Sequence, residues 1–318
     1  MADAAKKKAT RDSYGEALVE VAKEHQNLFV LDADLAQATK TVTFKKAFPE
    51  RFIDCGIAEA NMMGIAAGLA ATGNIVFASS FAMFAAGRAF EQVRNSIAYP
   101  HLNVKIGATH AGISVGEDGA THQCCEDIAL MRSIPGMTII NPADDRETKL
   151  AVRAAAQADG PFYLRFGRLA VPALFDEDYH FEIGKGVLLR EGSDVTIIAT
   201  GLMVGEALQA QEMLLQQGIS AKVINIHTIK PIDKQIILEA AATTGAIVTA
   251  EEHNIIGGLG SAVAETVCES GHPVPVVRVG VEDVFGKSGP ALELLKVFGL
   301  SAENIVEKAK MAISLKNN

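Results

Sequence analysis

One glycine-rich loop gathers most of the side chains that could do chemistry. Between Thr109 and Gln123 the chain carries three glycines, two histidines, two adjacent carboxylates and two threonines. Ordering so flexible and polar a segment costs conformational entropy. That cost makes sense chiefly if the loop closes over a ligand. The loop therefore predicts a binding site for a polar ligand.

Further candidate residues follow the predicted strands. Asp32 and Asp34 come directly after the first strand, Glu59 lies at the start of a helix of small residues, and Phe81 and Phe84 follow the next strand. In open parallel sheets, ligands bind beyond the carboxyl ends of the strands. These five residues are therefore candidates for the same site as the glycine-rich loop.

The elements that must position these residues alternate between β-branched strands and helical stretches, which is typical of a parallel sheet wrapped by helices. Asp144 is predicted to cap one helix, with Glu147 at the capping-box position. In the first unit we predict strands at 27–31, 75–79, 104–108, 137–141 and 161–166, and helices at 15–25, 58–71, 84–98 and 146–158.

A loop over residues 169–184, with Pro172 and an acidic run, marks the predicted domain boundary. We predict an α/β fold with one domain at 9–172 and a second at 184–318, and we expect residues 1–10 to be a frayed tail. In the second domain we predict strands at 195–200, 221–226, 246–250 and 274–279, and helices at 204–217, 233–243 and 257–268, followed by two more.

The composition narrows the function classes. Apolar residues make up 49% of the chain and charged residues 21%, which is typical of a soluble globular protein. No apolar stretch approaches the roughly 20 residues of a membrane span. The formal net charge of −9 argues against non-specific nucleic-acid binding. The four cysteines form no C-x-x-C pair, so we interpret them as reduced thiols of a cytoplasmic protein.

The order of several motifs along the chain resembles transketolases, and the resemblance covers essentially the whole chain. The segment from Ala9 to Pro135 is similar to the pyrimidine-binding domain of that family, and residues from Thr228 onward are similar to its C-terminal domain. The motifs that carry the resemblance are Asp32-Ala-Asp34-Leu, Ile57-Ala-Glu59, Ser80-Phe81, Gly116-Glu-Asp118-Gly, Arg132-Ser-Ile-Pro, Thr228-Ile-Lys-Pro-Ile-Asp233, Glu251-Glu-His-Asn and Ser288-Gly-Pro.

The resemblance implies a thiamin-diphosphate-dependent transferase made from two kinds of chain. A complete transketolase begins with a domain that binds the diphosphate and Mg²⁺ through a Gly-Asp-Gly…Asn motif, and no such motif occurs in this sequence. We therefore expect a split enzyme in which a separate N-terminal subunit binds the diphosphate and the metal. The expected assembly is an α2β2 heterotetramer that uses sugar phosphates of the pentose phosphate pathway.

The family pattern also implies roles at the cofactor. Glu59 matches the carboxylate that hydrogen-bonds the pyrimidine N1′, and Asp34 matches a carboxylate near the thiazolium. Phe81 and Phe84 match the aromatic residues that contact the aminopyrimidine, Phe84 by stacking. Without the resemblance, Glu59 would be read as a charge favoured by a helix N-terminus, and the two phenylalanines as core residues.

At the substrate end, Arg11 and Arg168 match arginines that grip phosphate, for which the planar guanidinium fork is suited. Arg165 is a nearby competitor for the role of Arg168. His110 and His122 match positions that contact substrate hydroxyls and phosphate and take part in catalysis, and Asp118 matches a carboxylate that binds a hydroxyl beside the reacting carbon. An interface or structural role is open for Glu117.

The second domain offers less chemistry. The cluster Gly257–Gly260 could place a helix N-terminus beside an anion, but we interpret this region as mainly structural and dimer-forming. Two related enzymes remain as alternatives: deoxyxylulose-phosphate synthase and the beta-type chain of 2-oxoacid dehydrogenases, both of which release CO₂ from a 2-oxoacid. A third alternative is a non-catalytic scaffold derived from such a chain.

Overall fold

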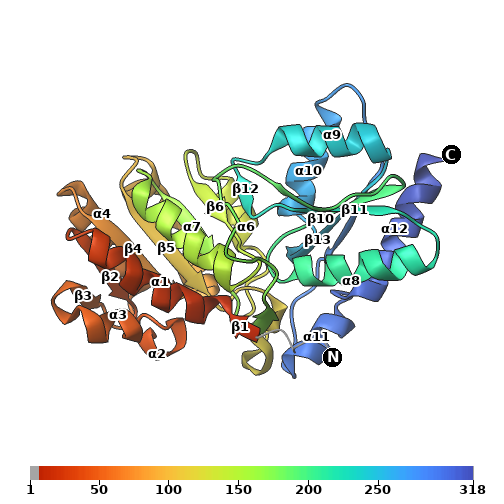
Figure 1. Cartoon of the computed structure of the whole chain (residues 1–318). Coiled ribbons are helices and arrows are strands. Elements are labelled where there is room, and N and C mark those ends of the chain that lie inside the picture. Colours follow the sequence, from red (N-terminus) through yellow and green to blue (C-terminus); the bar gives the residue numbers. More distant parts are fainter. Residues whose placement is uncertain (1–6, 318) are drawn as a thin grey trace.

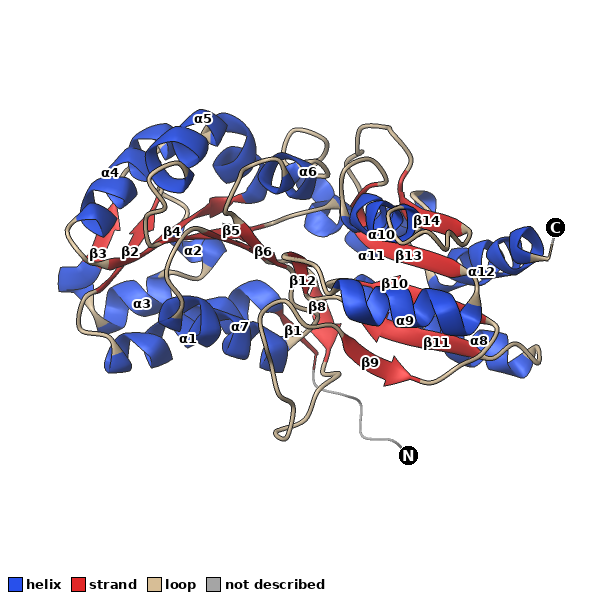
Figure 2. Ribbon diagram, turned by 90° about the horizontal axis from the view of Figure 1, so that it is seen from above, coloured by secondary structure: helices blue, strands red, loops and turns tan. Residues whose placement is uncertain are grey.

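A seven-stranded sheet forms the first half of the computed structural model, which describes residues 7–317 (Figures 1 and 2). The strand order is β12-β6-β7-β5-β4-β2-β3. All neighbouring strands are parallel except β12, which runs antiparallel to β6. The strands are β2 (Leu28–Asp32), β3 (Phe52–Asp54), β4 (Ile75–Phe81), β5 (Val104–Thr109), β6 (Thr138–Ile140), β7 (Phe162–Arg165) and β12 (Thr228–Lys230).

Helices cover both faces of this sheet (Figure 2). One face carries α1 (Thr10–Glu24), α3 (Val42–Ala47) and α7 (Asp145–Gln157), and the other carries α4 (Glu59–Ala71), α5 (Phe90–Gln92) and α6 (Asp127–Arg132). Short helices α2 (Ala36–Thr39) and η1 (Pro49–Arg51) lie in the connections. Because both faces are covered, every residue of β4 is buried.

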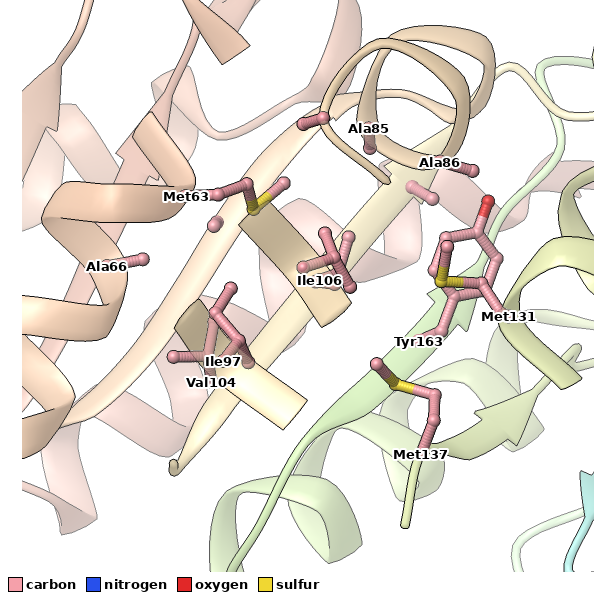
Figure 3. Close-up of a cluster of buried hydrophobic side chains, with 14 of the residues drawn as sticks. Met63, Ala66, Ala85, Ala86, Ile97, Val104, Ile106, Met131, Met137 and Tyr163 are labelled. Atoms are coloured by element: carbon pink, nitrogen blue, oxygen red, sulfur yellow. The ribbon is translucent and has the colours of Figure 1, made fainter. Parts of the chain in front are cut away.

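Small side chains allow α4 to pack closely on the sheet. Met63 and Ala66 of α4 share one apolar cluster with Ala85, Ala86 and Ile106, and Figure 3 shows their side chains. Alanines let neighbouring backbones approach closely, while methionine fills irregular gaps between them. This packing fixes the start of α4, and hence Glu59, against the end of β4.

The second half of the chain forms a five-stranded sheet in the order β14-β13-β10-β11-β9, with only β9 antiparallel to its neighbour. Helices α8 and α12 pack on one face, and α9 and α10 on the other. These elements are β9 (Val187–Arg190), β10 (Val195–Ala199), α8 (Met203–Gln216), β11 (Ala221–Asn225), α9 (Lys234–Thr244), β13 (Ile247–Asn254), α10 (Leu259–Cys268), β14 (Val276–Val281), α11 (Ala291–Val297) and α12 (Ala302–Lys316).

The predicted α/β architecture is confirmed, and so is the helix cap at Asp144. The Asp144 carboxylate accepts a hydrogen bond from the Glu147 backbone N–H at 2.9 Å. The Glu147 carboxylate, however, accepts from the Ala143 N–H at 2.7 Å rather than completing a capping box. The local pattern therefore predicted the helix start correctly and the reciprocal contact incorrectly.

One local prediction was right in position but not in helix type, and two others were wrong. The helix predicted over 84–98 consists of two π-helical turns, η2 (Met83–Arg88) and η3 (Val93–Ala98), on either side of α5. The loop over 169–184 contains β8 (Ala170–Pro172), and the predicted tail contains β1 (Lys7–Ala9), which pairs antiparallel with β8. Residues 1–6 of that tail lie outside the described residues. Backbone pairing between segments so far apart in sequence leaves no local pattern.

Strand β12 connects the two halves of the chain. It belongs to the second half by sequence, yet it pairs with β6 at the edge of the first sheet.

Between residues 7 and 317, no helix has the length and apolar character required to cross a membrane.

Candidate active site

Four aromatic rings at and beyond the ends of two neighbouring strands, β4 and β5, form the centre of the candidate site. The His110 ring stacks on Phe81 with 3.8 Å between centroids, and Phe81 lies 5.9 Å from Phe84 in a stacked arrangement. The His122 ring meets Phe84 edge-on at 5.3 Å. Phe81 ends β4 and His110 follows β5, which are adjacent parallel strands. The structure therefore brings together two predicted phenylalanines and two predicted histidines.

The hydrogen bonds of His110 define its protonation state. Arg11 lies 2.8 Å from Nε2, and since a guanidinium can only donate, Nε2 must accept. The proton then resides on Nδ1, which lies 2.9 Å from Thr109 Oγ1. Burial, reinforced by the nearby charges of Arg11 and Arg168, lowers the pKa of His110 from 6.5 to about 3. His110 is thus a neutral ring with one defined donor.

This neutral histidine should make the fold less stable in acid. Because the pKa is lower in the folded than in the unfolded chain, the stabilisation is full above pH 6.5 and is lost as the pH falls toward 3. Asparagine tolerates the backbone φ of +56° at this position, so we use the His110→Asn variant. When the pH falls from 7 to 5, the unfolding free energy of the parent should decrease by roughly 1 to 2 kcal/mol more than that of the variant. Urea unfolding at both pH values measures this difference.

The exposed His180 provides the matched control for that experiment. The His180→Asn variant should show the same pH dependence as the parent chain. An unchanged pH dependence in His110→Asn would contradict the assignment of a neutral, buried His110.

Glu59 is buried at the start of α4 with 1% of its surface exposed. Its Oε2 accepts a hydrogen bond from Arg88 Nη1 at 2.8 Å. The guanidinium carbon of Arg88 lies 4.5 Å from the centre of the Phe84 ring, so one side chain covers both a predicted carboxylate and a predicted stacking face. Arg88 was not among the residues predicted from the sequence. The one feature that could have suggested it is its position, four residues after Phe84.

The two predicted anion-binding arginines lie near each other, and Arg168 contacts the loop beside His110. Arg168 donates to the Val115 carbonyl, lies 3.2 Å from Glu117 and approaches Asp118 at 4.0 Å. Besides His110, Arg11 donates to the Ala38 carbonyl at 3.2 Å. Within the described part of the chain its Nε has no hydrogen-bond partner and is shielded from solvent.

Asp34 does not join the ring cluster in this chain. It is exposed, has a backbone φ of +62°, and donates its N–H to Asp54 at 3.1 Å. It lines a separate shallow pocket of about 270 Å³. The neighbouring Asp32 is structural, because its buried carboxylate accepts from Leu35 N–H, Thr39 and Thr41. Burial raises the pKa of Asp32 to about 6.

Arg165 does not compete with Arg168 for a ligand. Its side chain is buried, pairs with Asp127 at 2.8 Å, and donates to the Glu252 carbonyl of β13 at 2.9 Å. Glu252 in turn accepts from the Ser114 N–H at 2.5 Å, and burial raises its pKa to about 7. The second domain thereby holds the glycine-rich loop, a positioning role that the sequence reasoning missed.

The proposed anion site at the Gly257–Gly260 cluster is filled from within the chain. Both oxygens of the buried Glu251 accept hydrogen bonds at the start of α10, from Leu259 N–H at 2.7 Å and Gly260 N–H at 2.8 Å. An internal carboxylate therefore takes the place that an external anion would need. This observation supports the structural interpretation of the region.

Comparisons with known proteins identify the family of the chain. Residues 6–173 match the family described as transketolase, pyrimidine binding domain, and residues 184–305 match the transketolase C-terminal domain. The chain is 54% identical over 303 residues to a Methanocaldococcus jannaschii protein named "Putative transketolase C-terminal section", with 95% of each chain covered. It is 47% identical over 307 residues to the 6-deoxy-6-sulfo-D-fructose transketolase subunit SqwH of a Clostridium species, covering 96% of this chain and 95% of that one.

The fold comparison points the same way. A solved structure described as a split gene transketolase, inactive beta4 tetramer, superposes with a TM-score of 0.91 at 55% identity, over 97% of this chain and 99% of that chain. Two domain matches in the family's order and relatives matched almost end to end agree on one assignment. The chain therefore belongs to the transketolase family and carries its pyrimidine-binding and C-terminal domains, as the C-terminal section of a split transketolase does.

Proposed function

We propose that this chain is the pyrimidine-side subunit of a two-chain transketolase that transfers a two-carbon ketol unit from a ketose phosphate to an aldose phosphate. The observation that carries the proposal is the buried Glu59 carboxylate beside the ring cluster of Phe81, Phe84, His110 and His122. A buried acid next to flat aromatic faces suits a flat, polar heteroaromatic ring better than an aliphatic ligand.

The residues present fit the aminopyrimidine end of thiamin diphosphate. When bound, this cofactor supplies a nucleophilic carbon and an electron sink for the donor sugar. Phe84 would stack on the pyrimidine and Phe81 would lie against it, while Glu59 would share a proton with the ring nitrogen N1′. Within residues 7–317, Glu59 Oε2 accepts a hydrogen bond from Arg88, whereas Oε1 has no hydrogen-bond partner.

The same chain would hold the sugar. His110, whose Nδ1 carries the proton, and His122 would contact substrate hydroxyls and assist proton transfer there, and Asp118 would accept from a hydroxyl beside the reacting carbon. Arg11 and Arg168 would bind the remote anionic group. Binding energy from that remote group can hold the reacting end in position. The sulfo-sugar named for the Clostridium relative has a sulfonate, another tetrahedral anion that the same arginines could grip.

The proposed assembly is an α2β2 heterotetramer in the cytoplasm, with an N-terminal partner subunit that binds the diphosphate and Mg²⁺. Two findings support a partner. Relatives of nearly the same length carry names for a section or a subunit of transketolase, and the similar solved tetramer of one chain type is described as inactive. We propose domain limits of 9–172 and 184–318, with a contribution to the pentose phosphate pathway.

The test is the formation of sedoheptulose 7-phosphate from xylulose 5-phosphate and ribose 5-phosphate, with thiamin diphosphate and Mg²⁺. The chain is measured alone and with the N-terminal partner purified from the same source. Activity only with the partner is expected. Activity of the chain alone would refute the two-chain proposal. If a confirmed complex is inactive, 6-deoxy-6-sulfofructose and then pyruvate are the next donors, and CO₂ release from pyruvate would favour the 2-oxoacid alternatives.

Glu117 should weaken the binding of an anionic group by Arg168. A ligand phosphate must compete with Glu117, which lies 3.2 Å from the guanidinium. We expect Glu117→Gln to lower the KM for phosphorylated donors about two- to fivefold, a modest effect because the pair is exposed. The KM for erythrulose, a ketose without phosphate, is the control and should not change. An equal change for both donors would show that Glu117 acts on the loop and not on the anion.

A further inference from the structure

Arg88 places a flat, hydrogen-bonding cation over the two groups proposed to bind the aminopyrimidine. Its Nη1 donates to Glu59 Oε2 at 2.8 Å, and its guanidinium lies 4.5 Å above the Phe84 ring. A guanidinium is planar, presents N–H donors at its edge and stacks on aromatic faces. An aminopyrimidine also has a flat π face and an N–H edge. Arg88 therefore satisfies the same two partners by the same kinds of contact.

The two members of the ion pair differ in their freedom to move. The Glu59 side chain is 2% exposed, whereas the Arg88 side chain is 51% exposed. Glu59 is fixed by the packing of α4, so only Arg88 can leave toward solvent. Arg88 also ends the π-helical turn η2, where the Ala89 N–H bonds back to the Phe84 carbonyl. π-helical turns are rare and frequently occur at functional sites.

The ion pair also occupies a group that the proposed function assigns to the cofactor. Within the described residues Arg88 is the one cation that contacts Glu59, and it occupies one of the two carboxylate oxygens. Arg88 and the aminopyrimidine would therefore compete for the same carboxylate and for the same face of Phe84.

We propose that Arg88 is a displaceable latch, which rests on Glu59 and Phe84 in the free chain and gives way to the aminopyrimidine when the cofactor binds. This inference rests on the proposed function, because it takes Glu59 and Phe84 as the cofactor contacts. The Arg88 contact keeps the buried Glu59 carboxylate paired, and an unpaired buried charge would be costly. The consequence of the latch is that cofactor binding must first break the Arg88 contacts.

The latch predicts that removing Arg88 tightens binding of the cofactor. The complex of this chain with its N-terminal partner is titrated with thiamin diphosphate at fixed Mg²⁺, and binding is measured by calorimetry without substrate. We expect the Kd of Arg88→Gln to be roughly three- to thirtyfold lower than that of the parent, which is the range for losing one half-exposed ion pair and one cation–π contact. An unchanged or higher Kd would overturn the latch and make Arg88 a permanent support of Glu59.

Two further variants separate the latch from other effects. Arg153, which pairs with Glu24 at 2.8 Å on a distant surface, provides the matched control, and the Arg153→Gln variant should bind like the parent. In a Glu59→Gln background, Arg88→Gln should change the Kd less than it does alone, since the two residues act on each other. Equal effects in both backgrounds would overturn the proposed Arg88–Glu59 coupling.

The same titration distinguishes failure of the latch from failure of the proposed function. If the parent complex does not bind thiamin diphosphate, the proposed function fails and the latch fails with it. If the parent binds and Arg88→Gln is not tighter, only the latch fails. Thermal unfolding of each complex verifies that the variants are folded before they are titrated.

Discussion

Replacing Glu59 with glutamine is expected to reduce turnover of the assembled enzyme by about 100- to 10,000-fold, the usual range for loss of a group that transfers a proton in catalysis. Glutamine keeps the shape of the side chain but cannot accept or release a proton at its carbonyl oxygen. Because Glu59 lies inside the chain and contacts only Arg88 by hydrogen bond among the described residues, assembly with the partner should persist. Steady-state kinetics and size-exclusion chromatography of the complex measure the two effects.

Two comparisons sharpen the Glu59 experiment. Glu24 is also ion-paired with an arginine, but on the surface, and Glu24→Gln should leave turnover unchanged. Glu59→Ala should lose turnover as severely as Glu59→Gln, because both lack the carboxylate. Normal turnover in either Glu59 variant would favour a scaffold over an enzyme, whereas loss of the complex would show that Glu59 supports assembly.

Replacing Arg165 with methionine is expected to destabilise the chain by about 3 to 5 kcal/mol, since it leaves a buried charge on Asp127 without its partner. Both side chains are almost completely buried, at 3% and 0% exposure. Burial opposes ionisation of Asp127, but the Arg165 charge outweighs it and holds the pKa of Asp127 below its usual value. Arg165 also donates to the carbonyls of Cys124 and Glu252, so the substitution would remove hydrogen bonds to both domains.

Urea unfolding tests the Arg165 prediction. The matched control is Arg153→Met, which removes an exposed ion pair and should change the unfolding free energy by less than about 1 kcal/mol. A double variant, Asp127→Leu with Arg165→Met, removes both charges and should recover part of the lost stability. A loss for Arg165→Met no larger than that of Arg153→Met would mean that the buried pair contributes little to stability.

Structural features with a local signal could be predicted from the sequence. The alternation of strands and helices was predicted because the periods of 2.0 and 3.6 residues are visible within a few turns of chain. The Asp144 cap was also predicted, since the cap and the amide that it accepts are three residues apart. The ring cluster followed from motif order together with the rule that ligands bind at the carboxyl ends of parallel strands.

Contacts between segments that are distant in the sequence could not be predicted from it. Arg165 and Arg168 are three residues apart, and only the folded chain shows that one is buried against Asp127 while the other faces the loop at Glu117. The Gly257–Gly260 cluster was interpreted as mainly structural, but only the fold shows that the Glu251 carboxylate binds the backbone N–H groups there. Strand β12 gave no sign that it would pair with the first sheet.

The sequence was sufficient to predict most of the alternating strands and helices, the family motifs and most candidate residues, because these depend on neighbours along the chain. Which partner each charged side chain contacts depends on the tertiary structure. Arg88 meets Glu59 across 29 positions, and Ser114 meets Glu252 across 138. Such contacts form only when sheets and helices pack, since packing sets the distances and removes the water that would otherwise screen the charges.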